Sequence, residues 1–127
     1  MKKLLSVLIM TLTLSACHSA SVINGDYILT DAPYDAQITL NFSDADHRYS
    51  GKVVNQYFGT YKTDKNGHLT FGDTASTMMM GPENLMMAET QYFQDLSQVI
   101  GYKISPSHLT LILKNNKELV FKKQSTN

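Results

Sequence analysis

The sequence contains one cysteine and no tryptophan, which excludes cysteine-based cross-links within the chain and cysteine-rich metal sites and limits the side chains that can fill a core. With Cys17 alone, the chain has no internal disulfide, no cysteine-rich zinc site and no Cys-x-x-Cys redox pair. Without tryptophan, the largest side chains available to a core are tyrosine, phenylalanine and methionine. The stability of the folded part must therefore come from the packing of these and smaller apolar residues.

Neither sign of charge is in excess, because 11 basic residues face 11 acidic ones. Removal of an N-terminal segment containing Lys2 and Lys3 leaves nine basic and eleven acidic residues. This balance cannot neutralise a row of phosphates and argues against nucleic acid as a partner. Lysines near the C-terminus predict a solvated edge strand guarded by positive charge. They are Lys114, Lys117, Lys122 and Lys123.

Long apolar runs are also missing, since no stretch reaches the roughly 20 residues of a membrane-spanning helix. The longest is N-terminal, where a charged start is followed by a largely apolar run from Leu4 to Leu14 and by small residues at Ser15 and Ala16. This order predicts an export signal peptide over residues 1–16.

The end of that segment, Leu14-Ser15-Ala16-Cys17, resembles a bacterial lipobox. The resemblance implies cleavage before Cys17, diacylglycerol on its sulfur and a further acyl chain such as palmitate on its amine. His18 stands where an Asp would retain such a protein at the inner membrane, so the resemblance implies an outer-membrane anchor facing the periplasm. Residues 17–24 would be the lipidated tether. The alternative is an ordinary secretory signal followed by an incidental cysteine.

From Gly25 onward, short segments alternate apolar and polar residues, as half-buried strands do. Asn66-Gly67 predicts a tight turn inside a hairpin over residues 57–72. Gly51 is a candidate bulge, and Gly59 is expected to break its strand. The predicted strands cover residues 27–29, 38–42, 49–54, 57–62, 69–71, 102–104, 109–113 and 119–121.

One helix is predicted between these strands. Gly81-Pro82-Glu83 is a favourable start, with proline in the first turn and an acid near the positive end of the dipole. Gly101 is a plausible stop. Apolar residues at helical spacing form one stripe: Leu85, Met86, Ala88, Tyr92, Phe93, Leu96, Val99 and Ile100.

The predicted fold class is α+β: a small curled antiparallel β-sheet, barrel-like, with about seven or eight strands and one helix, after an N-terminal signal peptide. Residues 25–123 form the single domain.

The stretch from Arg48 to Leu96 resembles the META domain of the HslJ-like heat-shock lipoproteins. The resemblance rests on Gly51, on Asn55-Gln56-Tyr57-Phe58-Gly59, on the segment Ser76 to Pro82 and on Glu89. It implies a β-rich envelope protein linked to heat shock and stress response. It also implies structural roles for Asn55, Gly59, Thr77 and Glu89.

The sequence departs from the family pattern at residues that could carry thiol chemistry or a positive charge. Its frequent cysteines are replaced here by Val54 and Gly81, and its arginine by Met78. A disulfide or thiol role is therefore absent. We expect Glu89 to accept hydrogen bonds from backbone groups of a neighbouring loop near Asn55, the alternative being a solvated helix acid.

Methionines are concentrated in one short segment, at Met78, Met79, Met80, Met86 and Met87. Three interpretations stay open. They can fill gaps in a core that lacks tryptophan, which we favour, or line an adaptable apolar groove for a peptide or lipid. They can also bind Cu(I), which prefers soft thioether ligands.

No catalytic constellation is visible, so the sequence predicts a non-enzymatic protein without metal or other cofactor. The histidines, at positions 18, 47, 68 and 108, are scattered and predicted to lie on the surface. We expect a lipoprotein that contributes to envelope stress tolerance through binding an envelope protein or apolar ligand. The alternative is a pilotin-like or chaperone-like binder of an apolar peptide or acyl chain of an outer-membrane partner.

Overall fold

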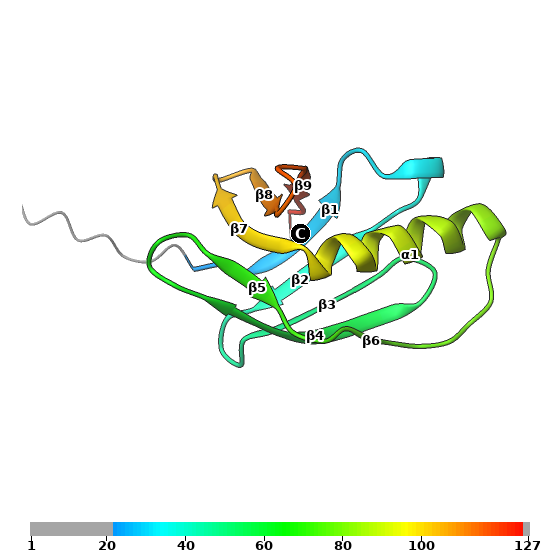
Figure 1. Ribbon diagram of the computed structural model, residues 1–127, viewed down its shortest axis with the longest axis horizontal. Helices are drawn as coiled ribbons and strands as arrows, with labels where there is room; N and C mark the ends of the chain where they lie inside the picture. The colour runs from blue at the N-terminus through cyan, green and yellow to red at the C-terminus, as the bar shows by residue number, and fades with distance from the viewer. Residues whose placement is uncertain (1–21, 126–127) are drawn as a thin grey trace, which may run out of the picture.

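Nine strands, one α-helix and one short 3-10 helix make up the computed structural model, which describes residues 22–125 (Figure 1). The expected signal peptide, Cys17, His18 and the first part of the tether lie outside these residues. In chain order the elements are β1 (Gly25–Leu29), η1 (Pro33–Asp35), β2 (Thr39–Ser43), β3 (Arg48–Lys52), β4 (Gln56–Thr63), β5 (Leu69–Phe71), β6 (Ala75–Ser76), α1 (Glu83–Ser97), β7 (Val99–Ile104), β8 (His108–Leu113) and β9 (Glu118–Lys123).

The strands form one antiparallel sheet in the order β5-β4-β3-β2-β1-β9-β8-β7, with β6 also paired to β4. Its two ends approach each other. His68 bridges Gly101, and the Tyr102 backbone N–H donates to the Gly67 carbonyl at 3.1 Å. The sheet is thus a nearly closed barrel with one helix, which confirms the predicted α+β, barrel-like fold of the domain.

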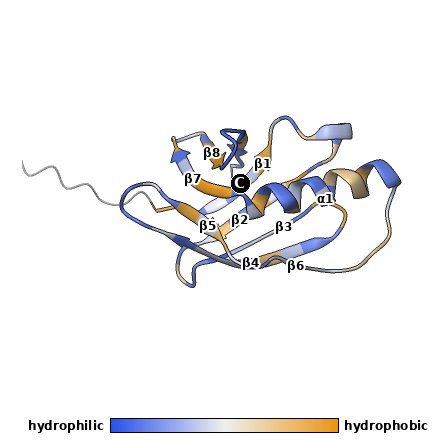
Figure 2. Cartoon of the chain, in the orientation of Figure 1, coloured by the Kyte–Doolittle hydropathy of each residue, from blue (hydrophilic) through white to orange (hydrophobic). Residues whose placement is uncertain are grey.

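Period-two alternation explains which side of each strand faces inward. In β2 and the residue before it, Ile38, Leu40 and Phe42 are each 0–1% exposed. The hairpin also follows the prediction, because Gly67 adopts φ 81° at the turn and Thr63 pairs with Leu69. In Figure 2 the loop of this hairpin is hydrophilic, whereas β5 and β7 carry apolar residues.

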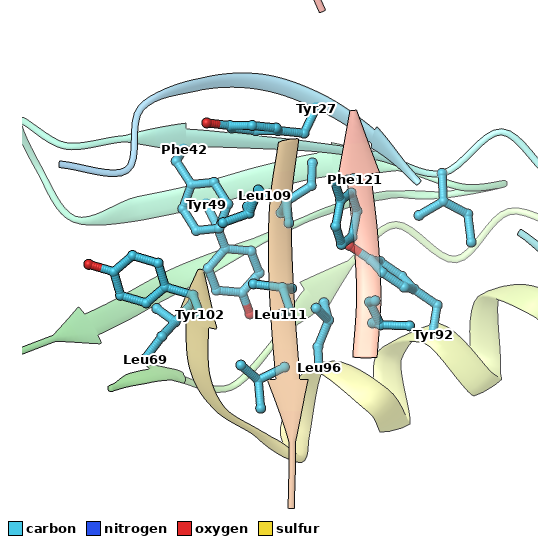
Figure 3. Packing of buried hydrophobic residues seen from close by; sticks show 14 of the residues in the cluster. Tyr27, Phe42, Tyr49, Leu69, Tyr92, Leu96, Tyr102, Leu109, Leu111 and Phe121 are labelled. Atoms are coloured by element: carbon cyan, nitrogen blue, oxygen red, sulfur yellow. The ribbon is translucent and has the colours of Figure 1, made fainter. Parts of the chain in front are cut away.

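The barrel interior is filled mainly by tyrosine, phenylalanine and leucine. Figure 3 shows Tyr92 and Leu96 of α1 pointing into the same interior as Leu111 and Phe121. The hydroxyl oxygens of Tyr57 and Tyr92 lie 2.8 Å apart, and Tyr57 donates its own proton to the Thr39 carbonyl. Tyr92 is therefore the donor of the pair. Burial raises the pKa of both hydroxyls, so both stay neutral and bonded.

The helix ends earlier than the apolar stripe predicts. α1 stops at Ser97, and the Gln98 backbone N–H caps it by donating to the Asp95 carbonyl at 2.9 Å. Val99 and Ile100 belong instead to β7, where a register shift separates Val99 from Gly101. β-Branched residues favour strands, and their spacing from Leu96 fits a helix only by coincidence.

Three other expectations about the sheet are wrong. Gly51 is no bulge, since it pairs in register with Leu40 and Tyr57. Gly59 does not break β4, which runs without interruption. β9 is not an edge strand, because β1 and β8 flank it; Lys122 therefore lies exposed within the sheet.

The register also fixes which ends of the strands lie together. β1 begins at Gly25, while near its other end Ile28 pairs with Thr39, which in turn pairs with Lys52. Lys52 directly precedes the turn between β3 and β4, residues 53–55. That turn and the start of the domain therefore lie at opposite ends of the sheet, as Figure 1 also shows for β1 and the start of α1.

Candidate functional site: an exposed methionine loop on a buried support

Glu89 is buried on the inner side of α1, with 5% of the residue exposed. Its Oε2 accepts hydrogen bonds from the backbone N–H of Val54 at 3.0 Å and of Asn55 at 2.7 Å. Its Oε1 accepts a third from Asn55 Nδ2 at 2.8 Å. A buried carboxylate without partners would be strongly destabilising, and these three donors offset its loss of water. The structure thus places Glu89 where the sequence analysis expected it.

Asn55 carries the connection onward to a loop, residues 77–82, that we call the methionine loop. Asn55 is 2% exposed, and its Oδ1 accepts from the Met79 backbone N–H at 2.6 Å and from Thr77 Oγ1 at 2.9 Å. Its Nδ2 also donates to the Met79 carbonyl at 3.1 Å. One side-chain amide therefore pairs with both backbone groups of Met79, as a neighbouring strand would.

Thr77 completes this support. Its hydroxyl oxygen accepts from the Gln56 backbone N–H at 3.1 Å, and its own N–H donates to the Gln56 carbonyl at 2.9 Å. We call Asn55, Thr77 and Glu89 the polar clamp. It ties the β3–β4 turn, the methionine loop and α1 together. Within residues 22–125, every buried side-chain nitrogen or oxygen has a hydrogen-bond partner.

Close packing against the turn also restricts the methionine loop. A Cβ atom added to Gly81 would lie 2.7 Å from Cγ1 of Val54, closer than side chains tolerate. Val54 and Gly81, which occupy the two positions where the family often has cysteine, thus pack against each other.

The methionine side chains are on the surface. Met78 is 94% exposed, Met79 66%, Met80 90% and Met87 55%, whereas Met86 is half-buried. The favoured prediction that these residues fill the core is therefore wrong. Tyrosine and phenylalanine occupy the interior instead, and α1 turns Ala88, Tyr92 and Leu96 inward rather than its methionines.

A hollow of about 390 Å³ follows the outer face of α1. Its lining residues are Glu83, Met86, Met87, Thr90, Gln91 and Gln94. The structure thus brings Met86 and Met87 together in one depression and places Met78, Met79 and Met80 on the adjoining loop.

Gly59, the fourth family-motif residue, lies away from the polar clamp. A Cβ atom there would lie 2.5 Å from the Tyr49 hydroxyl and 2.8 Å from the Asp73 carbonyl oxygen. Only glycine permits this approach. Sequence reasoning missed a second hollow of about 380 Å³ at the same place, where Arg48 and the half-exposed Phe58 are among the lining residues. The sequence did contain a signal for this exposed aromatic residue. Side chains alternate along a strand, so Phe58 must point outward if its neighbour Tyr57 on β4 points inward.

Two further polar contacts were not predicted. Asp95, at the C-terminal end of α1, is 8% exposed, and its Oδ2 lies 2.8 Å from Nζ of Lys117. Asp64 Oδ2 lies 2.6 Å from His68 Nδ1 at the hairpin turn. The hydrogen bond from His68 lowers the pKa of Asp64. Neither pair was visible as a sequence motif.

The described histidines, His47, His68 and His108, are exposed, as their positions near turns predicted. In the part of the chain that the structure describes, no group of three or more His, Cys, Asp or Glu residues is arranged to hold a metal ion. Over the same residues, no helix has the length and hydropathy of a membrane span.

The chain is similar to known proteins in both sequence and fold. The sequence model of the META domain matches residues 11–126. An NMR structure of a protein from Burkholderia xenovorans superimposes with a TM-score of 0.66 at 23% identity, covering 83% of this chain and 85% of that one. A second protein solved by NMR gives a TM-score of 0.60 at 20% identity, covering 79% of this chain and 89% of the other.

A crystal structure of a DUF4847 family protein from Bacteroides vulgatus gives a TM-score of 0.54 at 18% identity, covering 71% of this chain and 61% of that one. At such identities these likenesses show the fold alone. No curated protein matches the chain at a significant level.

Proposed function

The chain belongs to the META domain family, and we propose that it is a lipid-anchored envelope protein that acts by binding rather than by catalysis. The observation that carries the proposal is the methionine loop. Met78 and Met80 are almost fully exposed on a segment whose backbone the polar clamp holds through Met79.

A fixed loop with flexible apolar side chains suits binding for a physical reason. The backbone entropy of the loop is already lost in the free protein, so a partner does not have to order it. Methionine side chains adapt their shape to different apolar surfaces and are common at adaptable binding sites. Contiguous exposed apolar patches are uncommon on soluble proteins and often mark interaction sites.

The position of β1, the first described strand, is compatible with the anchoring part of the proposal. β1 begins at Gly25, at the end of the sheet opposite the β3–β4 turn that holds the methionine loop. An anchor at Cys17 would therefore leave the methionine loop directed away from the membrane. Several acyl chains at Cys17 would hold the protein stably, because each buried methylene contributes about 0.8 kcal/mol.

The family resemblance supports a contribution to envelope stress tolerance, with an envelope protein or apolar ligand as the partner. A pilotin-like or chaperone-like role is the second candidate, and the same exposed thioethers favour it. In that role the methionine loop would contact an apolar peptide or acyl chain of an outer-membrane protein. The two candidates differ in whether the partner fails to assemble in the membrane when this protein is missing.

Co-purification from detergent-solubilised membranes tests binding. The wild type is compared with Met78→Ser/Met80→Ser and with a matched control, Lys62→Ser/Lys65→Ser, on the exposed hairpin near the other end of the sheet. We expect a stoichiometric partner with the wild type and the lysine control, and its loss from the methionine variant at unchanged melting temperature. A partner that stays with the methionine variant would refute this surface as the binding site.

A separate experiment tests the anchor. Cys17→Ser should lose the mass of the lipid and move from the membrane to the soluble fraction. If the variant stays with membranes at the mass of the unaltered protein, the anchoring proposal is wrong.

A further inference from the structure

The five clustered methionines differ sharply in their access to solvent. Met78 and Met80 are 94% and 90% exposed, and Met79 and Met87 are more than half exposed. Met86, one helical position before Met87, is half-buried. Oxidation of a methionine sulfur depends on how freely an oxidant reaches it. These five residues therefore include two highly accessible side chains, Met78 and Met80, and a partly buried one, Met86, for comparison.

We propose that Met78 and Met80 form an oxidation site at which peroxides convert the methionine loop from an apolar to a polar surface. A sulfur lone pair attacks one oxygen of hydrogen peroxide, and the S–O bond forms as the O–O bond breaks. Sulfur loses two electrons, and the second oxygen leaves as hydroxide, which takes up the proton of the attacked oxygen to become water. The product, methionine sulfoxide, is reducible by methionine sulfoxide reductases, so the change is reversible.

The fold of the domain is protected from this reaction. The polar clamp holds Met79 through its backbone N–H and carbonyl, so it does not depend on any sulfur atom. A sulfoxide oxygen on Met78 or Met80 would meet water rather than a packed interior, because both side chains are already in solvent. Burial of a new polar group, the usual cause of damage by methionine oxidation, does not arise here.

The consequence for binding rests on the proposed function. If the methionine loop contacts an apolar partner, an added sulfoxide dipole must lose its water when the partner covers it, which weakens the complex. Oxidants in the envelope would then release the partner without unfolding this protein. The oxidation site itself depends only on the exposure of Met78 and Met80 and on the polar clamp. Its test is therefore independent of whether a partner binds.

Peptide mapping of the purified protein after limited hydrogen peroxide treatment tests the site. Fragmentation that resolves individual methionines gives a rate for each. We expect Met78 and Met80 to oxidise about fivefold to tenfold faster than Met86 in the folded protein, and all rates to converge in denaturant. The melting temperature should stay unchanged when both sites are oxidised. Equal rates in the folded protein, or a lower melting temperature, would overturn the proposal.

A variant separates the site from the proposed function. Met78→Leu/Met80→Leu offers no sulfur to oxidise at these positions, and the partner that it holds after peroxide is expressed as a fraction of what the same variant holds untreated. Peroxide should release the co-purified partner from the wild type and leave it on the leucine variant. If Met78 and Met80 oxidise first but neither protein ever holds a partner, the binding function fails and the oxidation site stands. Equal release from both proteins would refute control of binding at these residues.

Discussion

The carboxylate of Glu89 accepts hydrogen bonds from both the backbone and the side chain of Asn55, at 2.7 Å and 2.8 Å. These residues are 34 positions apart in the chain and belong to a helix and to a turn of the sheet. The contact fixes the position of α1 against the turn between β3 and β4. Asn55 Nδ2 also donates to the Met79 carbonyl, and Asn55 Oδ1 accepts from the Met79 N–H, so the same side chain fixes the methionine loop.

Replacing Glu89 by glutamine should destabilise the domain. Glutamine offers one acceptor oxygen, so its amide group must face another donor, either Asn55 Nδ2 or the backbone N–H groups of the turn. We expect Glu89→Gln to lower the free energy of unfolding by about 2–3 kcal/mol, measured by denaturant titration. Glu83→Gln, in the exposed first turn of the same helix, should cost less than about 1 kcal/mol. Equal effects of the two substitutions would contradict a structural role for Glu89.

Removing the Asn55 side chain should loosen the methionine loop before it unfolds the barrel. Asn55→Ala deletes the acceptor of the Met79 backbone N–H, which then opens to solvent. In hydrogen-exchange measurements, the backbone amide of Met79 should exchange about tenfold or more faster in the variant than in the wild type. Ser50→Ala, at an exposed position on β3, is the control and should leave the rate unchanged. An unchanged Met79 rate in Asn55→Ala would show that the loop is held by something else.

Sequence patterns predicted the sheet well because strand alternation and turn chemistry are local. Asn66-Gly67 marks its hairpin, and Leu40 and Phe42 mark an inward face, without reference to the rest of the chain. Barrel closure is not local, because the bridge between His68 and Gly101 depends on the summed twist and curvature of every strand between them. The end of α1 was misplaced for a related reason, since the next strand begins in phase with the helical stripe.

The candidate site was predicted only in part. The pairing of Glu89 with the loop near Asn55 came from the family resemblance, because no spacing rule connects residues so far apart. The exposure of Met78 and Met80 was missed, since methionine composition does not tell a core from a surface. What excludes them from the core is competition: the tyrosines and phenylalanines of the strands already fill the space.

Gly59→Ala should destabilise the domain by overpacking. Its new methyl group would lie 2.5 Å from the Tyr49 hydroxyl and 2.8 Å from the Asp73 carbonyl oxygen, and the second of these belongs to the backbone. We expect a loss of about 1–3 kcal/mol in the free energy of unfolding. Thr60→Ala, the exposed neighbour on β4, serves as the comparison and should cost less. A Gly59→Ala protein as stable as the wild type would show that the sheet yields freely here.

The hairpin turn should respond to acid through Asp64. Hydrogen bonds from His68 and from turn amides lower the pKa of this carboxyl below its ordinary value of 3.8. Since the folded pKa is the lower one, the contribution of Asp64 to stability is present above pH 3.8 and is lost as the pH falls through the folded value. An NMR titration of Asp64 should give a midpoint that rises toward 3.8 in His68→Ala. A midpoint that does not move would exclude His68 as the cause.

We propose that the clamped methionine loop is the surface that meets a partner. Photo-crosslinking in living cells tests it most directly, with a photoreactive amino acid at position 78 and, as the control, at position 65 on the exposed hairpin. We predict a discrete crosslinked species from position 78 that is absent from position 65. No adduct at position 78, or the same adduct from both positions, would contradict the claim.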